Sequence, residues 1–140
     1  MAQSLAAQLV AGDVILLEGD VGAGKTHFAR CAILALLATP EDVPSPTYTL
    51  VQTYIGSACE VWHADLYRLT DVSEIEELGL TQAFDTAITL IEWPDRLGDL
   101  SPQQALHVLL RQGAGGDARD ILISWSDPRW VQRVKAMQDV

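Results

Sequence analysis

One stretch, LLEGDVGAGKTHF, decides the fold of this chain, and it runs from Leu16 to Phe28. Inside it, residues 19–26 match the pattern G-x-x-x-x-G-K-[ST], in which a glycine-rich loop cradles phosphate groups. The apolar run VILLE at 14–18 precedes the loop and is typical of a buried parallel strand. Residues 25–38 follow it with helical composition and apolar periodicity. The stretch therefore predicts a phosphate-binding loop between a buried strand and a helix.

Each residue type in this loop has a chemical reason. Glycines allow positive φ angles and a close approach of backbone to phosphate, and the loop N–H groups form an anion nest at the positive end of the helix. We expect Lys25 to neutralise the β- and γ-phosphates and the Thr26 hydroxyl to bind Mg²⁺. His27 either offers its backbone N–H to phosphate or is a tolerated polar residue in the first helical turn. The predicted nucleotide-binding residues of this motif, the P-loop, are Gly19, Asp20, Val21, Gly22, Ala23, Gly24, Lys25, Thr26 and His27.

Two carboxylates are candidates for the acid that a P-loop enzyme needs for Mg²⁺ or for its attacking water. Glu92 ends the apolar run ITLIE, so we expect it at the C-terminal edge of the central sheet, where ligands bind in open α/β sheets. Asp65 ends the segment EVWHAD, which we interpret as part of a more polar and more mobile hairpin suited to a switch role. The alternative for each is a strand-end carboxylate that faces solvent.

The segment VPSPTYTL places three hydroxyl groups beside two prolines. Ser45, Thr47 and Tyr48 are candidates for reaching a γ-phosphate or its water, and they are the remaining predicted nucleotide-binding residues. An ordinary proline-rich connection is the alternative interpretation. We interpret the four tryptophans as core or rim packing rather than as platforms for base stacking: Trp62, Trp93, Trp125 and Trp130.

The remaining periodicities complete an alternating pattern of strands and helices. Strands are expected at 48–54, 60–66, 88–92, 105–110 and 120–125, and helices at 4–10, 70–79, 81–85 and 127–140. IGSAC at 55–59 is typical of a hairpin turn, and QGAGGDA at 112–118 of a glycine-rich turn. This order predicts an α/β P-loop NTPase fold: a mostly parallel central sheet with an antiparallel hairpin insertion and helices on both faces.

Length and composition limit the class of protein. The 140 residues, 49% of them hydrophobic, predict a single domain over 1–140. Nine Lys and Arg against nineteen Asp and Glu give a net charge of −10, which argues against strong direct binding of nucleic acid, because phosphate backbones are bound mainly by basic residues. The isolated Cys31 and Cys59, the lack of a signal-peptide pattern and the short apolar runs predict a cytoplasmic protein that is not in a membrane.

The expected nucleotide is ATP, with Mg²⁺ as its metal ion. Asparagine is absent from the whole chain, so the N-K-x-D motif with which GTPases read guanine is not present. Two other functions stay open on these residues: a small-molecule kinase that uses the same P-loop, and a nucleotide-dependent binding module without useful turnover.

Five blocks in order, GDVGAGKT, SPTYTLV, HADLYRL, EELGL and IEWPDRL, closely resemble the TsaE (YjeE) family over about residues 12–97. The resemblance is weaker from residue 101 onward. It implies a P-loop ATPase in the bacterial biosynthesis of tRNA threonylcarbamoyladenosine (t6A), working with the proteins TsaB and TsaD. It also implies ATP hydrolysis that is slow alone and stimulated by these partners, in support of a complex that modifies tRNAs reading ANN codons.

The resemblance also implies roles for single residues. Lys25 and Thr26 match the family's phosphate and Mg²⁺ positions, Glu92 its Mg²⁺-linked glutamate and Asp65 its essential aspartate. The predicted catalytic residues are therefore Lys25, Asp65 and Glu92, and the predicted metal ligands are Thr26 and Glu92. Residues 45–48 match the family's switch-like loop. His27 stands where the family usually has a second threonine, so a backbone contact to phosphate is expected there.

Overall fold

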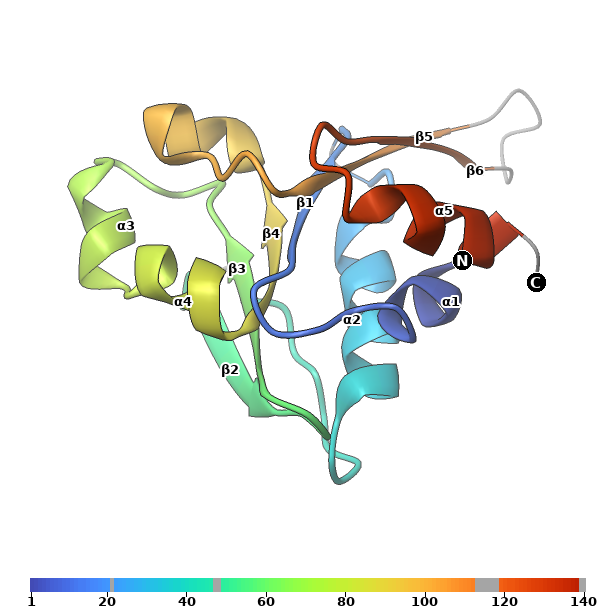
Figure 1. The fold of residues 1–140 in the computed structure, drawn as a ribbon. Coiled ribbons are helices and arrows are strands. Elements are labelled where there is room, and N and C mark those ends of the chain that lie inside the picture. The colour runs from blue at the N-terminus through green and yellow to red at the C-terminus, as the bar shows by residue number, and fades with distance from the viewer. Residues whose placement is uncertain (21, 47–48, 113–118, 139–140) are drawn as a thin grey trace.

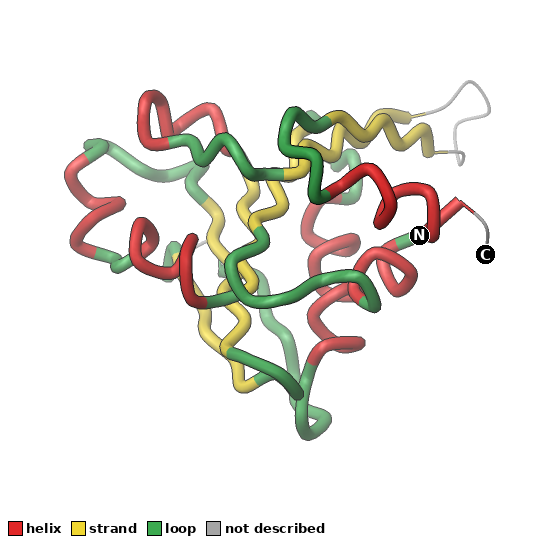
Figure 2. The backbone as a smooth tube through the Cα atoms, in the orientation of Figure 1, coloured by secondary structure: helices red, strands yellow, loops and turns green. Residues whose placement is uncertain are grey.

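A six-stranded sheet forms the centre of the computed structural model, which describes residues 1–20, 22–46, 49–112 and 119–138. The strands lie in the order β2-β3-β4-β1-β5-β6 and form a layer between helices (Figures 1 and 2). The strands are β1 (Val14–Glu18), β2 (Val51–Ile55), β3 (Glu60–Asp65), β4 (Ile88–Glu92), β5 (Leu106–Gln112) and β6 (Arg119–Ser124). The helices are α1 (Ala2–Ala6), α2 (Lys25–Leu36), α3 (Ser73–Glu77), α4 (Leu80–Thr86), the 3₁₀ helix η1 (Pro94–Leu100) and α5 (Trp130–Gln138).

The inner strands β3, β4, β1 and β5 run parallel, while β2 and β6 lie antiparallel at the two edges. The predicted mostly parallel α/β sheet with helices on both faces is confirmed. The predicted antiparallel hairpin is present as β2 and β3, but β3 is less polar in its surroundings than expected, because most of its side chains are buried. That strand pairs with β4 from Val61 opposite Ile88 to Asp65 opposite Glu92, so it is an interior strand of the central sheet.

The two faces of the sheet bury two separate cores. Ile15 and Leu17 of β1 pack in one core with α1, α2 and α5, whereas Val14 and Leu16 pack in the other with α3, α4 and η1. Successive strand residues point to opposite faces, so a strand that is covered on both faces reads as a continuous apolar run. Figure 1 shows α3 and α4 on one side of the sheet and α1, α2 and α5 on the other. No helix in the described residues is long and apolar enough to cross a bilayer.

Helix α1 does not occupy the predicted range 4–10, because it begins and ends earlier. The amides of Gln8 and Leu9 donate to carbonyls three residues back, which makes turns rather than an α-helix. The amide of Val10 donates to the Asp13 carboxylate at 2.7 Å. These bonds turn the chain into β1.

The boundaries of α2 and β2 also differ from the prediction, and the hairpin explains the first difference. Leu37 is extended and forms a β-bridge with Gly56, so α2 ends at Leu36 instead of residue 38. Strand β2 begins at Val51 because Leu50 has a φ angle of 67°, which is not a strand conformation. The predicted start of this strand, Tyr48, lies outside the described residues.

The predicted helix at 70–79 is shorter than expected, because its first residues form the cap. The Asp71 carboxylate accepts a bond from the Ser73 amide at 2.9 Å, and the Glu74 carboxylate accepts one from the Asp71 amide at 3.2 Å. The bond to Glu74 is the one that the acidic residue of a capping box makes, whereas the bond from Ser73 to Asp71 is an Asx turn. Gly79, at a φ angle of 83°, separates α3 from α4 as predicted.

The C-terminal region follows the prediction with shifted boundaries. Strand β5 is longer than predicted, and η1 was not predicted at all. Helix α5 begins at Trp130 rather than at residue 127, because Asp127 forms a turn in which its carboxylate accepts the Arg129 amide at 2.9 Å. The predicted glycine-rich turn falls largely on residues 113–118, and the predicted helix end falls on 139–140; both lie outside the described residues.

Candidate functional site

The loop between β1 and α2 has the backbone that its glycines predict. Gly19 and Gly24 have φ angles of 147° and 99°, which glycine adopts without steric cost. A Cβ atom on Gly19 would lie 2.5 Å from the carbonyl oxygen of Leu110, so a side chain does not fit there. The first N–H groups of α2 have no acceptor within the helix, which leaves its positive end at the loop. Val21, also predicted here, lies outside the described residues.

Lys25 is buried at the centre of this loop. Its Nζ donates to the carbonyl oxygens of Gly19 at 2.5 Å and Asp20 at 2.8 Å. Burial lowers the pKa of Lys25 from its ordinary value of 10.5, and the nearby carboxylates of Glu92, Asp65 and Asp20 oppose that shift. Lys25, one of only two lysines in the sequence, is thus the cation of an otherwise acidic site.

The structure brings the two predicted metal ligands into contact. The hydroxyl of Thr26 donates to Oε1 of Glu92 at 2.7 Å. Asp65 lies opposite Glu92 at the C-terminal ends of the neighbouring parallel strands β3 and β4, and both carboxylates are buried. Oδ1 of Asp65 accepts the Tyr67 amide at 3.0 Å. The alternative of solvent-facing carboxylates is therefore wrong for both acids.

His63 belongs to this site, although its sequence motif did not single it out. Its side chain is buried, and Nε2 lies 2.7 Å from Oε2 of Glu92. The signal that could have found it is the strand period, because residues 63 and 65 of one strand point to the same face.

Two aromatic side chains lie beside the P-loop. The ring of Trp93 lies 4.2 Å from Lys25 Nζ, measured to the ring centroid, and 5.0 Å from the ring of Tyr67. Trp93 also has a φ angle of 59°, an uncommon conformation for a bulky residue. These rings, the P-loop and the acids Asp65 and Glu92 line a cavity of about 450 Å³. Packing alone is therefore an incomplete interpretation of Trp93.

The predicted SPTY loop is not brought to this cavity by the described residues. Ser45 is exposed and is not among the residues that line the cavity. Thr47 and Tyr48 lie outside the described residues. Their predicted role in nucleotide binding stays a prediction.

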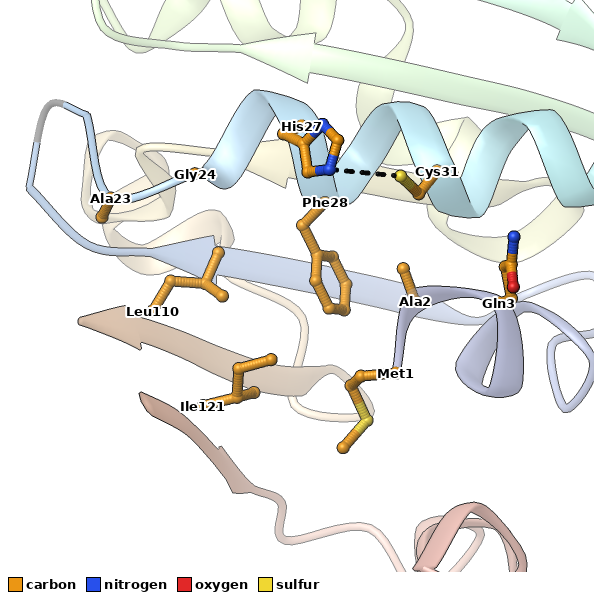
Figure 3. A pocket seen from close by; sticks show the side chains of 10 residues that line it. All are labelled: Met1, Ala2, Gln3, Ala23, Gly24, His27, Phe28, Cys31, Leu110 and Ile121. Atoms are coloured by element: carbon orange, nitrogen blue, oxygen red, sulfur yellow. Dashed lines mark hydrogen bonds between the residues drawn. The ribbon is translucent and has the colours of Figure 1, made fainter. Parts of the chain in front are cut away.

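A second, mostly apolar cavity of about 390 Å³ borders the P-loop at Ala23 and Gly24 (Figure 3). Ala2 of α1, Phe28 of α2, Leu110 of β5 and Ile121 of β6 line it. His27 borders both cavities, and its ring Nε2 lies 3.6 Å from the Cys31 sulfur. The start of α2 thus separates a polar, charged cavity from an apolar one.

The comparisons with known proteins agree with this fold. A family model described as threonylcarbamoyl adenosine biosynthesis protein TsaE matches residues 1–121. The protein named tRNA threonylcarbamoyladenosine biosynthesis protein TsaE from Rickettsia bellii is 40% identical over 110 residues, which cover 79% of this chain and 76% of that protein. Its counterpart from Rickettsia conorii is also 40% identical over 110 residues, and the match covers 79% of this chain and 63% of the longer relative.

A solved structure supports the fold over nearly the whole chain. The crystal structure of YdiB from Bacillus subtilis superposes with a TM-score of 0.75 and 26% identity, covering 99% of this chain and 85% of YdiB. Together with the family model, which spans residues 1–121, and the relatives at 40% identity, this similarity settles the family. The chain belongs to the TsaE family of tRNA threonylcarbamoyladenosine biosynthesis proteins.

Proposed function

We propose that this protein binds ATP and Mg²⁺ at its P-loop and hydrolyses the ATP in support of a TsaB–TsaD complex that forms t6A. The observation that carries the proposal is the 2.7 Å hydrogen bond between Thr26 and Glu92, beside the buried ammonium of Lys25. A hydroxyl, a carboxylate and a cation then meet at the loop that cradles phosphates. Family membership supplies the pathway.

The oxygen donors at this site are of the kind that Mg²⁺ prefers. Mg²⁺ takes oxygen ligands and is commonly held by one or two carboxylates together with substrate phosphates. The Thr26 hydroxyl and the Glu92 carboxylate supply two such oxygens, already 2.7 Å apart. When bound there, Mg²⁺ supplies neutralisation of the charge that develops on the phosphate oxygens.

Groups of the protein itself bind the phosphates and orient the attacking water. Lys25 and the N–H groups of the loop bind and orient the phosphates, which is most of the catalysis in phosphoryl transfer. Oxygens of Glu92 are engaged by Thr26 and His63, so Asp65 is the acid that we assign to the attacking water. Asp65 lines the same cavity and lies beside Glu92 across the strand pair, which supports this assignment.

The apolar cavity beside the P-loop is the proposed place of the adenosine. It adjoins Gly24 and His27, where the helix and the loop meet, and its walls include Phe28 and Leu110. A flat, apolar purine ring matches such walls better than the charged cavity does. The nucleotide would then lie across the start of α2, with its phosphates toward Lys25.

The proposed partners are proteins rather than nucleic acid. The chain carries a net charge of −10, which opposes tight direct binding of tRNA. Its cysteines, Cys31 and Cys59, are free thiols, which fits the reducing cytoplasm as the proposed location.

The test is phosphate release from ATP by the protein alone and with TsaB and TsaD. We expect slow release alone, stimulation by the two partners, and loss of both in Lys25→Ala. Lys135→Ala is the matched control, because this exposed lysine of α5 lies outside the site. Absence of release in every mixture, or stimulation that survives Lys25→Ala, would contradict the proposal.

The same assay separates the two alternative functions. With ATP labelled in its γ-phosphate, a small-molecule kinase transfers the label to a metabolite instead of releasing it as inorganic phosphate. A nucleotide-dependent binding module associates with its partners when ATP is present, and it keeps doing so in Asp65→Asn and Glu92→Gln.

A further inference from the structure

His63 is a buried polar side chain that the proposed reaction does not yet use. It lies on β3 with no exposed surface, and its Nε2 lies 2.7 Å from Oε2 of Glu92. The other oxygen of that carboxylate, Oε1, accepts the Thr26 hydroxyl at 2.7 Å. Both oxygens of Glu92 therefore have a fixed partner.

The direction of the His63 bond follows from the two groups. An ionised carboxylate only accepts hydrogen bonds, so Nε2 of His63 carries the proton. The other ring nitrogen, Nδ1, is buried and has no hydrogen-bond partner among the described residues. A proton on Nδ1 would add an unpaired buried donor, which is unfavourable. The geometry therefore assigns the Nε2–H tautomer.

A packing role does not explain this arrangement. A histidine kept only to fill space leaves Nδ1 buried without a partner, which costs stability that an aliphatic side chain would not cost. The hydrogen bond to Glu92 accounts for a polar ring at this buried position. A carboxylate held at one oxygen can still turn about its last side-chain bond, whereas one held at both oxygens cannot.

We propose that His63 is a positioning residue for magnesium: it donates Nε2–H to Oε2 of Glu92 and thereby holds Oε1 toward Thr26, where the ion would be bound. This inference rests on the proposed ATP and Mg²⁺ site. Partners that orient a metal-binding carboxylate in this way typically contribute about 10-fold to 100-fold to metal affinity.

The first test measures the Mg²⁺ concentration that gives half-maximal binding of a fluorescent ATP analogue. In His63→Leu, which keeps a similar volume but loses the donor, we expect this concentration to rise about 10-fold or more. Binding of the analogue in EDTA should stay unchanged, because His63 acts only through Glu92. His63→Gln places an amide donor near the Nε2 position and should restore most of the loss. His107→Gln, on β5 and partly exposed, is the matched control.

Four outcomes decide the inference. An unchanged Mg²⁺ requirement in His63→Leu overturns it, and so does an equal loss of binding with and without Mg²⁺, which a merely structural role predicts. The inference is also overturned if His63→Gln is folded and still needs as much Mg²⁺ for half-maximal binding as His63→Leu. In Glu92→Gln, adding His63→Leu should bring little further loss, and a full additional loss contradicts action through Glu92.

A second test uses the unaltered protein, so it does not depend on whether a variant folds. Two-bond ¹H–¹⁵N correlation spectra of the histidine rings, assigned with His63→Gln, report which ring nitrogen carries the proton. We expect Nε2–H at His63, and a proton on Nδ1 alone overturns the inference. If the wild type binds the analogue with no Mg²⁺ dependence, the proposed function fails. If the wild type binds the analogue with a Mg²⁺ dependence and His63→Leu has the same dependence, only this inference fails.

Discussion

Thr26 and Glu92 are 66 positions apart in the chain, yet the hydroxyl of one donates to the carboxylate of the other at 2.7 Å. The sheet makes this contact possible, because β1 and β4 are parallel neighbours and Leu17 lies opposite Glu92. The loop after β1 leads into α2, whose second residue, Thr26, meets Glu92 at the end of β4. Strand order, rather than any local motif, thus assembles the proposed metal site.

Replacing Thr26 by valine should weaken the Mg²⁺-dependent part of ATP binding. Valine keeps the shape but loses the hydroxyl, so the proposed ion loses one ligand and Glu92 loses one hydrogen bond. We expect the Mg²⁺ requirement to rise by about 10-fold to 100-fold, the range seen when the immediate surroundings of a metal are altered. Titration calorimetry with ATP, with and without Mg²⁺, measures it. Thr86→Val, on the exposed face of α4, should behave as wild type.

Replacing Lys25 by alanine should weaken ATP binding about 10-fold to 100-fold, because a hydrogen bond to a charged group contributes about 1.5–3 kcal/mol. Stability should not fall in parallel. Burial lowers the pKa of Lys25, so burying its charge costs free energy that the substitution recovers, whereas the two hydrogen bonds to Gly19 and Asp20 are lost. These effects oppose each other, so urea unfolding should show a change of no more than about 1 kcal/mol. A large loss of stability would instead make Lys25 a structural residue.

Filling the apolar cavity should separate recognition of the base from recognition of the phosphates. Cys31 borders this cavity from α2 (Figure 3), and Cys31→Phe adds a ring where we place the adenosine. We expect ATP affinity to fall about 10-fold or more, while binding of inorganic triphosphate stays the same. Cys31→Ser is the matched control of small size. If triphosphate binding falls equally, the base is not bound in this cavity.

The sequence predicted the parts of the site that depend on local pattern. The P-loop has a fixed spacing, and Glu92 ends a run apolar enough to mark a buried strand, so both were assigned correctly to the sheet edge. The sequence also named Asp65, but the strand that carries it was misjudged, because EVWHAD alternates and looks half-polar, whereas parallel pairing with β4 makes β3 an interior strand. His63 was missed for a related reason. The strand period places His63 on the same face as Asp65, but only strand order shows that its ring meets Glu92, 29 residues away.

Asp13 should be a key residue for stability, because it links the start of β1 to α5. Its carboxylate is fully buried and lies 3.3 Å from Nη1 of Arg129 and 2.5 Å from Nη1 of Arg133. Removing one partner of a buried ion pair costs about 3–5 kcal/mol. Both arginines are partly exposed and can return to water, so we expect about 2–4 kcal/mol for Asp13→Ala.

Urea unfolding of Asp13→Ala, with the exposed Asp120→Asn as control, measures this cost. The double variant Arg129→Ala/Arg133→Ala leaves the carboxylate buried and unpaired, so it should be at least as unstable as Asp13→Ala. A change below about 0.5 kcal/mol in Asp13→Ala, the size usual for surface substitutions, would mean that the pair does not hold α5 in place.

Tyr54 should make the protein less stable at alkaline pH. Its ring is buried on β2, and its hydroxyl has no hydrogen-bond partner among the described residues. Burial raises the pKa of Tyr54 above its ordinary value of 10.0, and Glu41 adds to the shift. The folded state therefore keeps the proton that the unfolded chain releases, so the free energy of unfolding falls as the pH rises above 10.0 toward the raised pKa.

Tyr54→Phe should remove this part of the fall in the free energy of unfolding. At pH 7 the variant should be as stable as the wild type or about 1 kcal/mol more stable, since it deletes an unpaired hydroxyl. Urea unfolding at neutral and alkaline pH, with the exposed Tyr67→Phe for comparison, measures both effects. A Tyr54→Phe variant that loses stability with pH as steeply as the wild type would show that this hydroxyl ionises normally in the folded protein.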